Sequence, residues 1–184
     1  MAVYSTDGAR VFDAIEFAAR AHRGQLRKGS NVPYIVHPLA VGKTLILHGC
    51  EEDVVIGGIL HDTLEDTKTT YDDIERSFGR RVAGIVAAES ESDKSLPWEQ
   101  REHMKVATMD VLLIACADKL DNVRTTREDY LRVGDVVWSH FKRGQDSQAW
   151  YHRSLADVFA SRVAGEPSTS LFGTYTGEVK EFFG

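Results

Sequence analysis

Apolar residues recur along most of this chain at the spacing of an α-helix. Between residues 7 and 23, Val11, Ile15 and Ala18 lie on one stripe and charged residues lie opposite. Further helices are predicted at residues 38–49, 52–64, 70–79, 80–89, 98–121, 134–142 and 146–163. No stretch shows the strict alternation of a β-strand. The pattern therefore predicts an all-α fold.

Breaks in the pattern divide the chain. Residues 24–36 contain Gly24, Gly29 and Pro33 and are predicted to form a loop. The stretch SESDKSLP at residues 90–97 has the composition of a turn. From Gly165 the helical pattern weakens, so we expect one domain over residues 1–164 and a partly mobile C-terminal tail over residues 165–184.

Composition narrows the functional classes. A length of 184 residues suits one domain with a real core, and a net charge of −6 argues against a general nucleic-acid binder. No apolar run approaches the roughly 20 residues that span a bilayer, and no secretory signal is visible. Cys50 and Cys116 lie in apolar surroundings without metal-site spacing, which indicates buried reduced thiols. We expect a cytoplasmic protein without nucleic-acid or membrane partners, in which a small anionic ligand needs local cations.

The stretch GILHDTLEDT at residues 58–67 places four ionisable side chains directly after an apolar helix. In helical geometry His61 shares a face with Glu65, and Asp62 shares a face with Asp66. Taken alone, Glu65 and Asp66 are also consistent with the solvent-exposed end of a helix. The preceding Gly57–Gly58 pair fits either a close approach of neighbouring elements to His61 or plain helix packing.

Two more segments offer partners for this cluster. His37 follows an apolar run in YIVHP, and Asp118 follows the most apolar stretch of the chain, VLLIACA, which we expect to be buried. A buried carboxylate is costly unless it is paired or bound to a metal ion. Alone, His37 fits a core histidine and Asp118 fits an ion-pair partner of Lys119 or Arg124.

Together, these residues form a candidate catalytic metal site. Its four proposed ligands are His37, His61, Asp62 and Asp118. Two imidazoles and two carboxylates without a cysteine suit Mn²⁺, Fe²⁺, Co²⁺ or Zn²⁺. Four protein donors leave coordination positions open on an octahedral ion, as catalytic sites require.

The H…HD…D pattern resembles the HD-domain metal-dependent phosphohydrolases. AHRGQLRKGSNVPYIVHPLAV, GGILHDTLEDT, FGRRVAGIV, DKSLPW and ADKLDNVRT resemble, in order, the hydrolase domain of the RelA/SpoT alarmone enzymes and, more closely, the stand-alone small alarmone hydrolases of the Mesh1 type. The resemblance covers about residues 8–160. It implies an HD-domain helical bundle that uses Mn²⁺ to hydrolyse the 3′-pyrophosphate of ppGpp or pppGpp, giving GDP or GTP and pyrophosphate.

The resemblance also implies roles for individual residues. The four metal ligands named above would hold Mn²⁺, while Glu65 and Asp66 would orient or deprotonate the attacking water. Arg27 and Lys28 would flank the nucleotide base. The remaining substrate contacts would come from Asn122, Arg124 or Thr125 for the ribose and phosphates, and from Tyr151, in preference to Trp150, for the distal phosphate or sugar. Without the resemblance, each basic residue would be interpreted as solvated or salt-bridged.

Two other functions fit the same residues. One is a metal-dependent phosphatase for another phosphorylated nucleotide, such as NADPH. The other is a regulator that binds a nucleotide without turnover, although such a protein has no need of Glu65 and Asp66 beside a metal ion. Asp121 is a departure, because relatives often carry His or Tyr there, and its negative charge near the phosphate path would weaken binding or change the preferred substrate.

Overall fold

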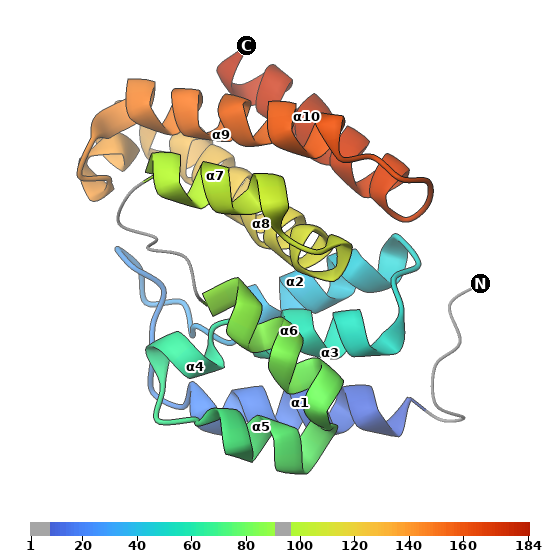
Figure 1. The fold of residues 1–184 in the computed structure, drawn as a ribbon. Coiled ribbons are helices and arrows are strands. Elements are labelled where there is room, and N and C mark those ends of the chain that lie inside the picture. Colours follow the sequence, from blue (N-terminus) through green and yellow to red (C-terminus); the bar gives the residue numbers. More distant parts are fainter. Residues whose placement is uncertain (1–7, 91–96) are drawn as a thin grey trace.

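The computed structural model describes residues 8–90 and 97–184, and these residues form an all-α fold (Figure 1). The helices are α1 (Ala9–Ala21), α2 (Val36–Leu47), α3 (Glu52–Leu60), α4 (Thr63–Asp66), α5 (Tyr71–Phe78), α6 (Arg80–Ser90), α7 (Pro97–Val106), α8 (Met109–Val133), the 3₁₀-helix η1 (Gly134–His140), α9 (Gly144–Ser161) and α10 (Ser168–Phe183). Within these two ranges no β-strand occurs, and the loop after α1 holds one isolated bridge, between Leu26 and Pro33. The predicted fold class is confirmed.

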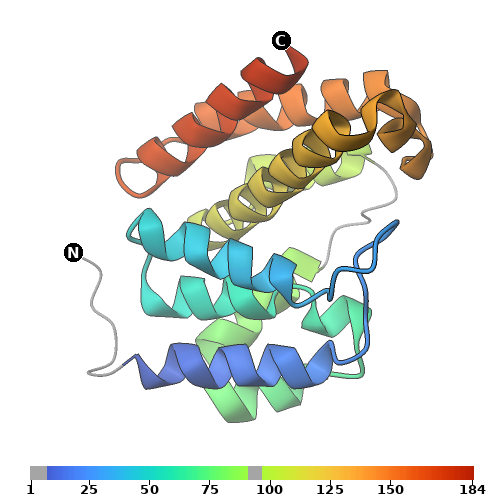
Figure 2. The ribbon, with the colours of Figure 1, turned by 180° about the vertical axis from the view of Figure 1, so that it is seen from behind.

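The helices form two groups, α1–α6 and α7–α10, which both views of the ribbon show one above the other (Figures 1 and 2). In the first group α3 is central and contacts α1, α2 and α6. In the second group α8 packs against α9 and α10, and it also contacts α2, α3 and α6. The residues of VLLIACA, 111–117, are all buried on α8, as predicted. This helix therefore joins the two groups, and the polar end of its buried stretch faces the first group.

The HD dipeptide lies in a break between two helices. The predicted helix at residues 52–64 ends at Leu60, and α4 begins at Thr63. The hydroxyl of Thr63 donates to the carbonyl of Leu60 (2.7 Å), and Nδ1 of His61 donates to the carbonyl of Gly58 (2.8 Å). Side chains thus satisfy carbonyls in the last turn of α3, which allows the chain to leave the helix here.

The predicted helix at residues 98–121 is two helices. Thr108 caps the start of α8 by accepting from the backbone N–H of Val111 (3.5 Å). Arg162, the residue after α9, donates to the carbonyls of Met104 and Lys105 in the last turn of α7 and of Ala107 just beyond it. These contacts satisfy backbone groups on both sides of the break, so a continuous helix is not required. Of the DKSLPW motif, residues 93–96 lie outside the described residues.

The C-terminal segment is more ordered than the predicted tail. Residues 168–183 form α10, which packs against α8 and α9. Its buried side chains include Leu171, Phe172, Tyr175 and Val179, which belong to the same core as the rest of the protein. The expectation of a weakly patterned, partly mobile tail was therefore wrong for these residues.

Glycines 57 and 58 serve helix packing. A Cβ on Gly58 would lie 2.3 Å from Cδ1 of Leu45 on α2, and a Cβ on Gly57 would lie 3.0 Å from Cδ1 of Ile114 on α8. The neighbours that come close are apolar core residues, so plain helix packing is the better of the two interpretations. Cys50 and Cys116 are buried thiols, and burial raises the pKa of Cys50 to about 12. Across the described part of the chain, helices of the length and hydropathy needed to cross a membrane are absent.

Candidate active site

Most of the predicted site residues line one cavity of about 690 Å³. It lies between the loop after α1, the α3–α4 break, α8 and the start of α9. The predicted residues on its wall are Arg27, Lys28, His37, Asp62, Glu65, Asp66, Asp118, Asn122, Thr125 and Tyr151. A second cavity of about 510 Å³, beside Trp150 and the C-terminus, contains none of them. The larger cavity is therefore the candidate active site.

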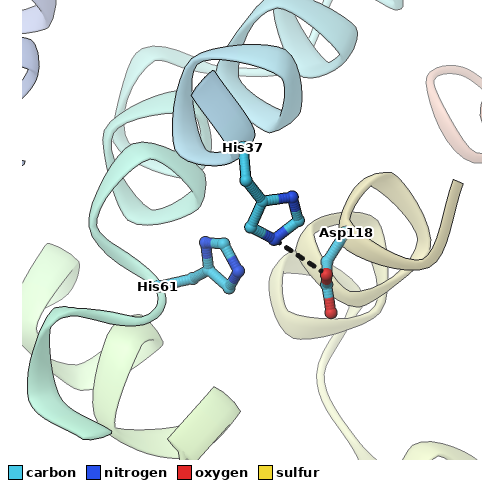
Figure 3. Close-up of side chains that lie close together, drawn as sticks. All are labelled: His37, His61 and Asp118. Atoms are coloured by element: carbon cyan, nitrogen blue, oxygen red, sulfur yellow. Dashed lines mark ion pairs between the residues drawn. The ribbon is translucent and has the colours of Figure 1, made fainter. Parts of the chain in front are cut away.

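Three of the four predicted metal ligands form a compact group (Figure 3), in which His37 and Asp118 line the cavity and His61 lies behind its wall. His37 comes from the first turn of α2, His61 from the α3–α4 break and Asp118 from α8. One ligand atom from each lies within 4.8 Å of the others, and Nε2 of His37 lies 3.1 Å from Oδ1 of Asp118. All three side chains are buried, with at most 4% of each residue exposed.

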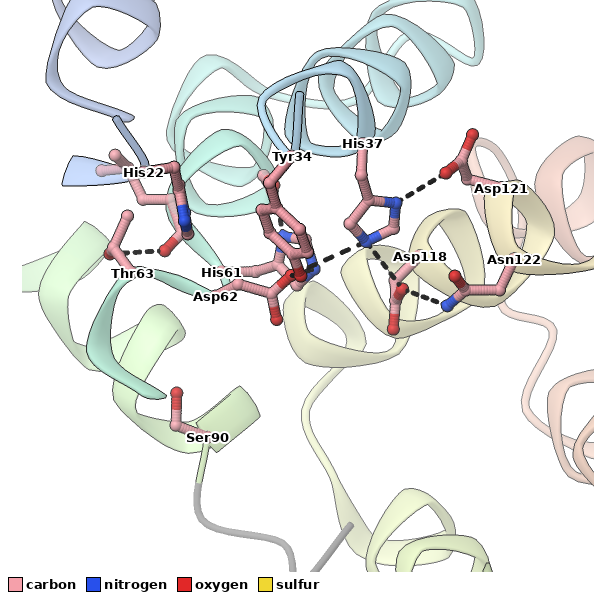
Figure 4. Close-up of polar contacts among 12 residues, drawn as sticks. His22, Tyr34, His37, His61, Asp62, Thr63, Ser90, Asp118, Asp121 and Asn122 are labelled. Carbon is pink, nitrogen blue, oxygen red and sulfur yellow. Dashed lines mark hydrogen bonds and ion pairs between the residues drawn. The ribbon is translucent and has the colours of Figure 1, made fainter. Parts of the chain in front are cut away.

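Hydrogen bonds fix the tautomer of both histidines. Nδ1 of His61 faces the carbonyl of Gly58, which can only accept, so this nitrogen carries the proton. Nδ1 of His37 likewise donates to the carboxylate of Asp121 at 2.6 Å (Figure 4). In each neutral ring the lone pair therefore lies on Nε2, and Nε2 of His61 is fully buried, where it faces the carboxylate of Asp62. These residues fit a divalent cation, because histidine ligands in metal sites commonly donate their second nitrogen in this way.

Asp62, the fourth predicted ligand, lies beside this group. Its Oδ2 is 2.9 Å from Nε2 of His61 and 3.6 Å from Nε2 of His37. The same oxygen accepts a hydrogen bond from the hydroxyl of Tyr34 at 2.6 Å. Tyr34 also lines the cavity, and no sequence signal had singled it out. The structure therefore brings all four predicted ligands together.

The charges of the cluster are strongly coupled. Burial by itself lowers the pKa of His61, but the charge and hydrogen bonding of Asp62, with the charge of Asp118, outweigh burial and raise it to about 9. The pKa of His37 is raised as well, since hydrogen bonds to Asp118 and Asp121 overcome burial. Asp118 is buried, yet the charge of Lys119 and its contact with His37 hold its pKa well below the usual range. Such a site attracts cations, and a metal ion would replace the protons on the histidines.

One face of α8 provides the adjoining wall of the cavity. Asp118, Asn122 and Thr125 follow at intervals of four and three residues, so they point the same way. Asn122 donates to Oδ1 of Asp118 at 2.7 Å, and Lys119 donates to Oδ2 at 2.6 Å (Figure 4 shows the former). The ion pair with Lys119 that the sequence allowed for Asp118 therefore exists, inside the candidate site.

Arg124 does not reach the cavity. It lies on another face of α8, and its guanidinium donates to Glu178 of α10 at 2.5–3.0 Å. The predicted substrate contact of Arg124 is therefore not supported by this geometry, whereas Thr125 remains in place. Tyr151 lines the cavity and Trp150 lines the second one, which agrees with the preference for Tyr151.

The remaining predicted residues lie at the mouth of the cavity. Glu65 and Asp66 are exposed on α4, where the carbonyl of Asp66 accepts from Nε2 of Gln25 at 2.6 Å. Arg27 is half-buried and contacts Asp121 and Asn122, each at 3.4 Å, while Lys28 is exposed. Sequence reasoning missed four further cavity residues, because no local pattern links residues 140–152 to the HD motif. They are His140 at the end of η1, Lys142, Arg143, and His152 in α9.

The chain is similar to several known proteins. A family model described as HD domain matches residues 14–146. The guanosine-3′,5′-bis(diphosphate) 3′-pyrophosphohydrolase MESH1 of Xenopus tropicalis is 38% identical over 154 residues, which cover 79% of this chain and 83% of that protein. The crystal structure of lmo0812 from Listeria monocytogenes EGD-e has a TM-score of 0.69 at 32% identity and covers 84% of this chain and 100% of that one. A structure described as a metazoan ortholog of SpoT that hydrolyzes ppGpp has a TM-score of 0.70 at 27% identity, with coverage of 99% and 97%.

Proposed function

Because this chain belongs to the HD-domain family, and within it to the small alarmone hydrolases, which are metal-dependent phosphohydrolases, we propose that it hydrolyses the 3′-pyrophosphate of ppGpp or pppGpp. The products are GDP or GTP and pyrophosphate. The observation that carries the proposal is the convergence of His37, His61 and Asp118, each with a ligand atom within 4.8 Å of the others, beside a cavity that Glu65 and Asp66 also line. A nucleotide is supported as the ligand by the cavity's volume of about 690 Å³ and by the cations around it.

We propose Mn²⁺ as the resident ion, held by His37, His61, Asp62 and Asp118. A mixed set of imidazole and carboxylate donors without thiolate supports this assignment. When bound, such an ion supplies Lewis acidity to the phosphoryl group and lowers the pKa of water.

The carboxylates of Glu65 and Asp66 serve proton transfer in the proposed reaction. The oxygen of a water molecule bonds to the phosphorus attached to the 3′ oxygen, and the bond between that phosphorus and the 3′ oxygen breaks. One of the two carboxylates takes the proton that the water loses, and the carboxylic acid so formed gives a proton, directly or through water, to the departing 3′ oxygen. The exposure of both carboxylates at the cavity mouth supports this role, since water and the proton reach them directly.

The other cavity residues bind and orient the nucleotide. Lys119 lies beside Asp118 and supplies positive charge where the phosphoryl oxygens gather negative charge. Arg27 and Lys28 flank the base, and a guanidinium can stack on a purine as well as form hydrogen bonds. Asn122 and Thr125 contact the ribose and phosphates, and Tyr151 contacts the distal phosphate or sugar.

The test is turnover of ppGpp by the purified protein with Mn²⁺, with the products separated by anion exchange. We expect GDP and pyrophosphate in equal amounts, loss of turnover on addition of EDTA and recovery when excess Mn²⁺ is restored. Orthophosphate from NADPH or another phosphorylated nucleotide, with ppGpp left intact, would instead assign a phosphatase. Tight nucleotide binding without any product would assign a regulator.

A further inference from the structure

Asp118 and Asp121 approach the ring of His37 from opposite sides. Asp118 Oδ1 lies 3.1 Å from Nε2, and Asp121 Oδ2 lies 2.6 Å from Nδ1 (Figure 4). Both carboxylates come from α8, three positions apart, so one rigid helix sets both contacts. The ring of His37 is therefore held between a residue of the metal cluster and a residue outside it.

We propose that Asp121 is a positioning residue that sets the affinity of the site for its divalent cation. The proposal rests on the assignment of His37 as a metal ligand. By accepting the Nδ1 proton, the carboxylate holds the neutral ring in the tautomer with its lone pair on Nε2 and fixes the direction in which that lone pair points. Removal of such partners from metal-bound histidines typically weakens metal binding by about 10–100-fold.

The surroundings of Asp121 support this role. Only 16% of its side chain is exposed, so its bond to His37 is shielded from competing water. The guanidinium of Arg27 is its other contact, at 3.4 Å, which is longer than the 2.6 Å bond to His37. Charge-assisted hydrogen bonds are strongest at short distances, so His37 is the principal partner and Arg27 is secondary. The wall of the cavity includes His37 and Asn122 but not Asp121, so this carboxylate contacts the ring from outside the cavity wall.

Metal affinity of the chelated and dialysed protein, titrated with Mn²⁺ in a calorimeter without nucleotide, tests the proposal. We expect Asp121→Leu to raise the dissociation constant by about 10–100-fold. Asp121→Asn keeps an acceptor but loses the charge, and its dissociation constant should fall between those of the parent and Asp121→Leu. Asp129→Asn is the control, because it removes a carboxylate from the same face of α8 that does not contact His37. Its dissociation constant for Mn²⁺ should stay within about twofold of the parent value.

A double-mutant cycle separates positioning from other effects. In a His37→Ala background, Asp121→Asn should cause no further loss of affinity, because the ring that it positions is gone. Parent-like affinity of folded Asp121→Leu and Asp121→Asn would overturn the proposal, and so would an equal loss in Asp129→Asn. If circular dichroism shows that Asp121→Leu does not fold, the Mn²⁺ affinity of Asp121→Asn decides the test. Nucleotide is absent throughout, so a failure to cleave ppGpp would leave this result unaffected.

Discussion

The two sides of the cavity are built differently. On the metal side, His37, His61 and Asp118 are buried and each is fixed by a hydrogen bond or ion pair. On the opposite side, Lys28, Lys142 and Arg143 are exposed on long side chains that come from loops. Catalysis requires side chains that are held in a fixed geometry, whereas flexible cationic side chains can adapt to a flexible, charged nucleotide. We therefore expect substitutions on the metal side to reduce metal binding and turnover. Substitutions on the opposite side should instead reduce the affinity for substrate.

The largest effect should come from Asp118→Asn. The substitution keeps the shape of the side chain but removes a buried charge from the metal cluster. Because a divalent cation is worth several kcal/mol to phosphoryl transfer, turnover of ppGpp should fall by about 10³-fold or more. Metal analysis of the purified variant should find little Mn²⁺. The matched control is Asp110→Asn in the first turn of the same helix, whose partner is Arg81. Equal metal content in both variants would contradict the cluster assignment.

Asp66→Asn should separate chemistry from binding. It removes a proposed proton acceptor at the cavity mouth, so turnover should fall by about 10²–10⁴-fold while metal content and nucleotide affinity persist. Rates under single turnover and calorimetric binding of ppGpp measure these quantities. Asp72→Asn changes an exposed carboxylate on α5 outside the cavity and should retain the parent rate. A parent-like rate in Asp66→Asn would remove Asp66 from the mechanism.

Two arginines test the substrate side. Arg27→Ala should raise KM by about 10–150-fold with little change in metal content, since a hydrogen bond to a charged group contributes about 1.5–3 kcal/mol. Arg124→Ala should leave KM unchanged and reduce the free energy of unfolding by about 1 kcal/mol or less, because its ion pair with Glu178 is partly exposed. Steady-state kinetics and denaturant unfolding measure both variants. Equal rises in KM would show that Arg124 reaches the substrate after all.

The smallest effect should appear in the pH dependence of the metal-free protein. The pKa of His61 is about 9 in the folded state and near 6.5 when unfolded, so the stabilisation from its charged form is complete below about pH 6.5. This stabilisation should be lost as the pH rises from about 6.5 to 9. With saturating metal the decline should be absent, because metal-bound histidine carries no such proton. Thermal unfolding of both forms over this pH range measures the difference.

A separate pH effect should appear at the acidic end. Burial and the charge of Lys119 lower the pKa of His152 to about 3, so its contribution to stability is present above about pH 6.5 and declines as the pH falls below that value. Its Nδ1 lies 2.8 Å from the hydroxyl of Tyr175 on α10. His152→Gln should flatten the acidic part of the stability curve without changing the decline in stability between about pH 6.5 and 9.

The sequence predicted the metal side of the cavity better than the opposite side. His61 and Asp62 are adjacent after an apolar helix, and Asp118 ends an apolar run. Ionisable side chains that are expected to be buried stand out in a sequence for this reason. Lys142 and Arg143 follow no such apolar run. Their place beside the HD motif depends on how α8 and α9 pack, which no local pattern encodes.

The missed helix boundaries have similar causes. α10 contains Gly173, Gly177 and several Ser and Thr residues with weak helix propensity, and packing of its buried residues against α8 and α9 compensates. The break before α8 depends on Arg162, which lies far along the chain from the carbonyls that it satisfies. Asp121 was noticed only as an unusual charge, because its bond to His37 is a tertiary contact.

The origin of the three cluster residues has a consequence for the chain as a whole. His37 and His61 belong to the first group of helices and Asp118 to the second, so one ion bound by them would act as a cross-link between distant segments. Like a disulfide, such a link restricts the chain most when the loop that it closes is long. Removal of the metal ion by a chelator should then loosen the packing of α8 against α2 and α3. Amide hydrogens at this interface should exchange faster, while those within α9 and α10 keep their exchange rates.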